Sequence, residues 1–224
     1  MISFLKKILN FYYREYKLSL SGFQDILTNI TFFFISIFIF IFSIGPEKDK
    51  LSLLGIGIIW ALLLLSSTLS LRKFYQEDYE SGNLVILHLN GFSYELIAIL
   101  KTISHFVFVQ IPFLLSIPVA SILLNISEEK MYSLILSFLI GSMILSCLGS
   151  ISSSMNLLNQ RNYLLGSVIV MILSIPVIIF SVGIINVGES FNSLVGVLVG
   201  ILLMIFAINP WASGACLKLA LQHS

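Results

Sequence analysis

Charge is scarce in this sequence. Charged residues make up 10% of its 224 residues and hydrophobic residues make up 58%, whereas soluble domains hold roughly 25% charged and 45–50% apolar residues. The formal net charge is +1, and no basic tract is interleaved with aromatic side chains, which argues against a nucleic-acid partner. The composition therefore predicts a protein whose main solvent is lipid.

The residue patterns of catalysis and metal binding are missing as well. Cys147 and Cys216 lie in separate apolar segments without the spacing of a metal site or a disulfide frame. The chain has no G-x-x-x-x-G-K-[ST] motif for nucleotide phosphates and no H-E-x-x-H, and no paired carboxylates or nucleophile and base share a face. We therefore expect no catalytic residue, no metal and no cofactor bound by this chain.

What the chain has in abundance is long apolar runs. A bilayer core about 30 Å thick needs about 20 apolar residues in a helix. Runs of that order, too long and too uniform for barrel strands, cover residues 26–44, 51–71, 96–124, 131–157, 163–187 and 193–217. No acidic residue falls inside them, which disfavours an ion-coupled carrier, because such carriers usually keep a carboxylate at membrane depth.

The distribution of Lys and Arg predicts the orientation of these six spans. An inside N-terminus leaves only Lys48, Lys50 and Lys130 on the outer side. The cytoplasmic side then holds the others, in keeping with the positive-inside rule: Lys6, Lys7, Arg14, Lys17, Arg72, Lys73, Lys101, Arg161 and Lys218. We expect both termini in the cytoplasm.

Residues 1–24 have a two-faced pattern of their own. Basic and polar side chains, such as Lys7 and Arg14, alternate with an apolar set at helical spacing. This predicts an amphipathic helix in the inner interface of the membrane, followed by a six-helix transmembrane domain over residues 25–224. A frayed polar tail is the alternative. The apolar set is Phe4, Leu5, Ile8, Phe11, Tyr12 and Tyr16.

The longest polar stretch between spans is FYQEDYESGNL, residues 74–84. Leu71, Phe74, Tyr75 and Tyr79 recur at helical spacing, so we expect a short amphipathic helix that Gly82 stops. An apolar patch over residues 84–89, a turn at residues 90–91 and an N-cap at Ser93 should follow. Residues 72–95 are then either a solvated connector or a docking element for a cytoplasmic partner, and their length and aromatic content favour docking.

Several motifs together resemble one family, the cytochrome c maturation heme exporter protein B (CcmB) family. They are SIGPE (residues 43–47), GIIWALLLLSS (57–67), an acidic loop with Glu77, Asp78 and Gly82, LKTISH (100–105) and two later prolines. The family-motif residues are Gly45, Pro46, Glu47, Gly57, Trp60, Lys101, His105, Pro112 and Pro118. The resemblance implies an all-α membrane protein of the ABC-2-type permease kind, in a bacterial inner membrane or a mitochondrial one.

The resemblance also implies partners and a role. Two copies of the chain would pair with a separate CcmA-like ATPase that binds ATP, and would associate with CcmC-like, CcmD-like and CcmE-like subunits that handle heme. Heme is the possible cargo. The alternatives are a non-transporting scaffold that releases the heme chaperone and a generic ABC-2 exporter permease. The residues implied to dock the ATPase are Phe74, Tyr75, Glu77, Asp78, Tyr79, Glu80 and Gly82.

Two further patterns concern the membrane interior. His105, one turn after Lys101, is either a functional group facing the bundle interior or a neutral histidine hydrogen-bonded across helices, and the second is favoured because no ligand partner lies at helical spacing. Small residues let helices approach closely, and they serve either a subunit interface or packing within the chain. They form two stripes, Ser142, Ser146, Ser150 and Ser154, and Gly196 and Gly200.

Overall fold

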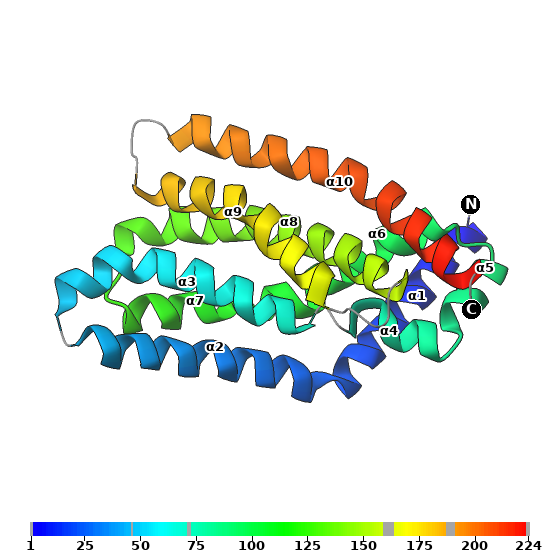
Figure 1. Cartoon of the computed structure of the whole chain (residues 1–224), viewed down its shortest axis with the longest axis horizontal. Coiled ribbons are helices and arrows are strands. Elements are labelled where there is room, and N and C mark those ends of the chain that lie inside the picture. The colour runs from blue at the N-terminus through cyan, green and yellow to red at the C-terminus, as the bar shows by residue number, and fades with distance from the viewer. Residues whose placement is uncertain (1, 46, 71–72, 159–163, 187–190, 223–224) are drawn as a thin grey trace.

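The protein is a helical bundle in its computed structural model (Figure 1). The structure describes residues 2–45, 47–70, 73–158, 164–186 and 191–222, and these ranges contain helices and turns but no strand. The α-helices are α1 (Ile2–Ser21), α2 (Phe23–Ile44), α3 (Lys48–Ser70), α4 (Lys73–Glu80), α5 (Asn83–Leu89), α6 (Tyr94–His105), α7 (Ile111–Leu123), α8 (Met131–Leu158), α9 (Leu164–Asn186) and α10 (Phe191–Gln222).

Six helical stretches in the described ranges are long and apolar enough to cross a membrane, as the sequence predicts. They are Phe23–Ile44, Lys48–Glu80, Tyr94–Leu123, Glu128–Leu158, Gly166–Ile185 and Phe191–Gln222. The second stretch includes α3 and the polar helix α4, and residues 71–72 between them lie outside the described residues. The chain is therefore an all-α membrane protein.

The third span is built from two helices. A π-helix, Phe106–Gln110, separates α6 from α7, and the N–H of Ile111 donates to the carbonyl of Phe106 five residues earlier. Pro112 explains this change from i−4 to i−5 hydrogen bonding, because proline has no N–H and its ring clashes with the carbonyl four residues before it. A π-turn at this point removes the clash while the span continues.

Helix α8 is the centre of the bundle. It packs against α9, α10 and α4, while α10 also contacts α6, and α2 lies on α3 and α7 at the other side (Figure 1). In the most apolar window of α8, 67% of the residues are buried inside the protein, against 6% for α10. In that window of α10, most residues therefore keep some surface for lipid or for another chain.

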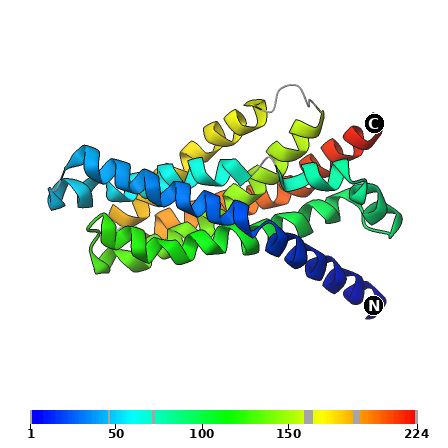
Figure 2. The ribbon, with the colours of Figure 1, turned by 90° about the horizontal axis from the view of Figure 1, so that it is seen from below.

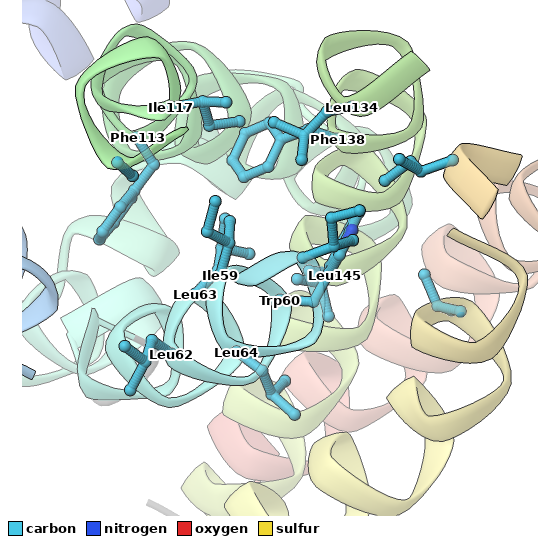
Figure 3. Close-up of a cluster of buried hydrophobic side chains, with 14 of the residues drawn as sticks. Ile59, Trp60, Leu62, Leu63, Leu64, Phe113, Ile117, Leu134, Phe138 and Leu145 are labelled. Atoms are coloured by element: carbon cyan, nitrogen blue, oxygen red, sulfur yellow. The ribbon is translucent and has the colours of Figure 1, made fainter. Parts of the chain in front are cut away.

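The main core lies between α3, α7 and α8 (Figure 3). Trp60 on α3 is 1% exposed, and its ring centroid lies 5.9 Å from that of Phe138 on α8. Gly141 lies one turn further along α8, and a Cβ there would collide with the indole ring of Trp60. A large aromatic side chain on one helix and a bare backbone on the next thus bring α3 and α8 close together.

Helix α1 leaves the bundle at an angle (Figure 2). It is helical over Ile2–Ser21, which argues against a frayed tail for the described residues, and its place in the membrane interface stays a prediction. Phe11 is 3% exposed and its ring lies 6.1 Å from that of Phe92. Figure 1 places α1, α4, α5 and the end of α10 at the same end of the bundle.

Candidate functional site around helix α4

The polar stretch of the sequence forms a pair of short helices. Helix α4 ends at Glu80, and Gly82 in the turn that follows has a φ of +72°, a conformation that glycine adopts at little cost. The N–H of Gly91 donates to the carbonyl of His88 in the predicted turn, and Ser93 Oγ accepts from the N–H of Leu96 as the N-cap of α6. The helix, its stop, the turn and the cap are confirmed.

The apolar patch predicted between them is itself a helix, α5. Leu84 and Leu87 are buried, while Val85 and Leu89 are exposed. Leucine is a good helix former, and the i, i+3 pair can be buried only if the segment is helical. The exposed side chains on the other face of α5 leave apolar surface at this end of the molecule.

Helix α4 presents two faces with different roles. Phe74, Tyr75 and Asp78 are 6%, 0% and 3% exposed, so these side chains contact this chain itself. Their assignment to a docking surface is corrected by the structure: they hold α4 on the bundle. Glu77 and Glu80 are exposed on the opposite face, and the docking role stays a prediction for that face.

The remaining two residues of the predicted docking set lie at the end of α4. Tyr79 is half-buried, and its hydroxyl donates to the carbonyl of Ala220 near the end of α10 at 3.4 Å. Gly82 is also half-buried and carries no side chain. Neither residue gives a partner much surface, so the exposed carboxylates are the main chemistry on the outer face of α4.

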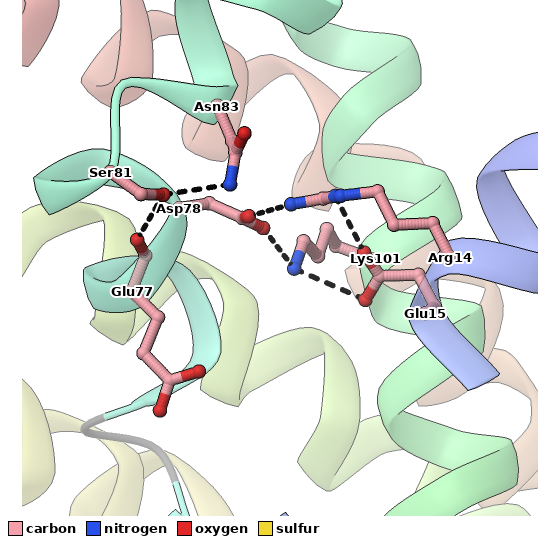
Figure 4. Close-up of polar contacts among 7 residues, drawn as sticks. All are labelled: Arg14, Glu15, Glu77, Asp78, Ser81, Asn83 and Lys101. Carbon is pink, nitrogen blue, oxygen red and sulfur yellow. Dashed lines mark hydrogen bonds and ion pairs between the residues drawn. The ribbon is translucent and has the colours of Figure 1, made fainter. Parts of the chain in front are cut away.

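A charged cluster lies beneath α4 (Figure 4). Asp78 forms ion pairs with Arg14 of α1 and with Lys101 of α6. Glu15 of α1 completes the cluster, with its carboxylate 3.0 Å from Arg14 Nη1 and 3.1 Å from Lys101 Nζ. Two cations and two carboxylates therefore form a closed ring that ties α1, α4 and α6 together.

Burial makes this ring sensitive to the loss of any member. The side chains of Glu15, Asp78 and Lys101 are 9%, 4% and 9% exposed, and that of Arg14 is 28% exposed. The four formal charges cancel, so the ring can be removed from water as a neutral unit. Deleting one partner of a buried ion pair typically costs about 3–5 kcal/mol, because a charge is left without its counter-ion.

His105 joins α6 to two other helices. Its Nε2 lies 3.1 Å from Ser70 Oγ on α3, and its Nδ1 lies 3.0 Å from Ser146 Oγ on α8. The imidazole also stacks against Phe74 with a centroid distance of 4.8 Å. Both ring nitrogens have serine partners on neighbouring helices, which is the favoured cross-helix role.

A chain of buried hydrogen bonds starts at the inner face of α4. Tyr75 Oη lies 2.8 Å from Ser150 Oγ on α8, which in turn lies 3.0 Å from Ser213 Oγ on α10. Ser213 donates to Asn209 Oδ1 at 3.0 Å, and Asn209 Nδ2 donates to Thr102 Oγ1 on α6 at 2.9 Å. These buried groups satisfy one another and connect α4 to α8, α10 and α6.

The two stripes of small residues have different surroundings. Every serine of the stripe on α8, namely Ser142, Ser146, Ser150 and Ser154, is buried within the chain. Gly196 and Gly200 on α10 are exposed, and a Cβ at either position would have no neighbour within 4 Å. The serines therefore serve packing and hydrogen bonding inside the chain, and the glycine pair is open to lipid or another chain.

The other family-motif residues lie away from α4. Gly45 follows the end of α2 with a φ of +89°, and Glu47 forms an ion pair at 2.8 Å with Lys50 in the first turn of α3. Gly57 faces outward, Pro118 lies inside α7, and Pro46 falls outside the described residues. Only Lys101 and His105 of the motif set join the cluster around α4.

Sequence reasoning missed Glu15, the second carboxylate of the ring. A signal was present, because Glu15 lies four residues after Phe11 and three after Tyr12, on the apolar face of a basic helix. An acidic residue on such a face needs a buried cation. Asn209 and Ser213 were missed too, and their i, i+4 spacing in an apolar helix gives a similar signal of a shared polar face.

The fold and this site define a multi-pass helical membrane protein with a helix pair mounted on one end of its bundle. The sequence of residues 6–220 matches the family model described as CcmB protein. The chain belongs to the CcmB family, and the resemblance noted in its motifs is confirmed over nearly its whole length.

Curated relatives match with similar coverage. The Heme exporter protein B of Haemophilus influenzae is 28% identical over 213 residues, which is 94% of this chain and 96% of that protein. The Heme exporter protein B of Bradyrhizobium diazoefficiens is 30% identical, over 92% of this chain and 94% of its own. The Heme exporter protein B of Paracoccus denitrificans is 32% identical, over 86% of this chain and 90% of that protein.

Proposed function

We propose that this chain is the membrane-spanning subunit of an ABC-type heme exporter that acts in c-type cytochrome maturation. ATP is hydrolysed by a separate ATPase chain that docks on the exposed face of α4. Two copies of this subunit assemble with two copies of the ATPase. The membrane is the bacterial inner membrane, and both ends of the chain are cytoplasmic. Heme-handling subunits and a heme chaperone are the further partners.

The observation that carries this proposal is the mounting of α4. A connector that only joins two spans needs no buried attachments of its own. Helix α4 instead has an ion-paired carboxylate against α1 and α6, and a tyrosine hydroxyl against α8. A force on α4 would therefore reach α6 and α8 through direct contacts, which is what a coupling element requires.

The outer face of α4 supplies the chemistry for docking. Glu77 and Glu80 are exposed one turn apart, and exposed charges steer association and fix register at an interface. An ATPase with a basic surface groove would complement them. Because neither residue is a member of the charged ring, their reversal should change binding while the fold is kept.

The test is co-purification of the tagged chain from mildly solubilised membranes, followed by mass spectrometry. We expect an ABC ATPase with the wild type and its loss from the Glu77→Lys/Glu80→Lys variant. The matched control is Glu128→Lys/Glu129→Lys, an equal charge reversal on the exposed loop before α8, which should keep the ATPase. Absence of an ATPase from the wild type would overturn the permease proposal, and equal retention by all three would overturn the docking face.

Transport and scaffold functions differ in one measurable quantity. Vesicles that hold the assembled complex should move heme in an ATP-dependent way if the chain is a permease. A scaffold would release the heme chaperone on ATP hydrolysis without moving heme. Heme accumulated in the vesicle lumen, measured with and without the ATPase, therefore separates the two functions.

A further inference from the structure

A polar pocket lies between α4 and the junction of α1 with α2. Its volume is about 450 Å³, within the range of small-molecule sites. Its charged lining consists of Glu15, Asp25, Glu77, Asp78 and Lys101, and Ser19 and Ser104 are among its neutral polar residues. Because α1 is amphipathic and α2 is the first span, this junction lies where a membrane's polar headgroups begin.

One side chain of the pocket is left without a partner. Ser104 is 3% exposed, and its Oγ has no hydrogen-bond partner among the described residues. A buried hydroxyl in that state costs free energy that a ligand atom would recover. Lys101 lies one turn earlier, and its ammonium has three N–H donors, of which the carboxylates of Glu15 and Asp78 take two.

An apolar groove continues from this pocket. It has a volume of about 190 Å³ and runs between the α1–α2 junction and the start of α7, along Tyr16, Phe23, Leu27 and Pro112. Ser19, Ile26 and Phe108 line both the pocket and the groove. The same wall thus passes from charged side chains to purely apolar ones, which is the polarity gradient of an amphiphile.

The charges of the pocket indicate the kind of headgroup. A purely anionic headgroup would approach Glu15 and Asp78 as well as Lys101, and like charges repel at close range. A zwitterionic headgroup can place its phosphate near Lys101 and Ser104 and its ammonium near the carboxylates of the wall. A primary ammonium has N–H donors for carboxylates, whereas a quaternary ammonium has none.

We propose that the pocket and the groove together bind one aminophospholipid, with a phosphoethanolamine headgroup in the pocket and an acyl chain in the groove. The lipid fills the angle between α1 and the bundle and contacts α4 and α6 at the charged ring. This inference rests on the described residues of this chain and holds whether or not the cargo is heme.

The experiment is native mass spectrometry of the full-length protein in detergent. Dioleoyl phosphatidylethanolamine, phosphatidylcholine and phosphatidylglycerol are offered at equal concentration, and the adducts that survive collisional activation are counted. We expect one retained phosphatidylethanolamine per chain, with weaker retention of the other two. Equal retention of all three lipids, or preference for phosphatidylglycerol, would overturn the proposal.

Two variants and one control test whether the lipid binds at this pocket and groove. Ser19→Trp fills the wall shared by pocket and groove and should weaken retention at least about tenfold, whereas Tyr13→Trp, an exposed position on α1 that lines neither, should not. Ser104→Ala should weaken retention about three- to tenfold, as expected for one lost hydrogen bond. Retention by Ser19→Trp equal to that by Tyr13→Trp would place the lipid elsewhere.

Two further measurements separate lipid binding from folding and the headgroup from the acyl chain. Ser104→Ala removes an unpartnered buried hydroxyl, so its melting temperature in lipid-free detergent should be no lower than that of the wild type. Soluble glycerophosphoethanolamine should compete far less than the intact lipid, because it has no chain for the groove. Equal competition by the headgroup alone would contradict the role given to the groove.

Discussion

Replacing Asp78 by asparagine keeps the size of the side chain and removes one negative charge from the ring. Lys101 and Arg14 then share the carboxylate of Glu15 alone, and a net positive charge stays in a buried place. Arg14 is 28% exposed and can turn toward water, whereas Lys101 is 9% exposed and cannot do so without moving α6. The cost therefore falls mainly on the Lys101 ammonium.

The expected loss of stability is about 3 kcal/mol, the lower end of the range for breaking a buried ion pair, because Arg14 can relax. For a chain of this size it corresponds to a fall of about 6–12 °C in melting temperature. Lys101→Met should cost a similar amount, since it leaves the two carboxylates with Arg14 alone. The double variant Asp78→Asn/Lys101→Met keeps the Arg14–Glu15 pair and is neutral again, so it should be more stable than the sum of the two losses predicts.

The assay is thermal unfolding of the purified protein in detergent, followed by far-ultraviolet circular dichroism, for the wild type, both single variants and the double variant. Glu80→Gln on the exposed face of α4 is the control and should melt like the wild type. A coupling energy of about 2 kcal/mol between the two sites is expected. Strict additivity, or a stable Asp78→Asn variant, would refute the claim that the ring is one electrostatic unit.

Two further substitutions test the packing. His105→Ala should lower stability by only about 1–2 kcal/mol, because without the ring the hydroxyls of Ser70 and Ser146 can both donate to backbone carbonyls of their own helices. A melt measured beside the charge variants checks this, and a loss as large as that of Asp78→Asn would contradict the simple cross-helix role. Gly141→Ala should cost about 1–3 kcal/mol through its collision with Trp60. Gly57→Ala, with open space at its Cβ, is the control, and equal melting temperatures for the two alanines would show that α3 and α8 do not depend on this contact.

The helices of the bundle could be predicted because their signal is local. A run of apolar residues long enough to span lipid has few alternatives to a helix, since every backbone group must find a partner within the segment. The N-cap at Ser93 and the stop at Gly82 also depend on a few neighbouring residues. The helical form of α5 was missed because an apolar patch of about six residues has no distinctive period.

The pairing of charges could not be predicted in the same way. Phe74, Tyr75 and Asp78 fall on one helical face by their spacing, yet all three were assigned together with the exposed carboxylates to a docking surface. The partners of Asp78 lie 64 and 23 residues away in the chain, and nothing local connects them. The helical period of the sequence predicts which face of the helix such a charge occupies, whereas its partner depends on how the helices pack.

Three charges in this chain break their local pattern: Glu15 and Asp78 on apolar faces, and Lys101 inside an apolar run. A lone buried charge is costly in or near lipid, so charges of opposite sign that break the pattern should meet one another. In the structure these residues share one ring.

Because the ring occupies the inner face of α4 while Glu77 and Glu80 are exposed and outside the ring, partner binding and attachment to the bundle depend on different side chains. A helix built this way would carry a push from outside to α6 without giving up the contacts that hold it.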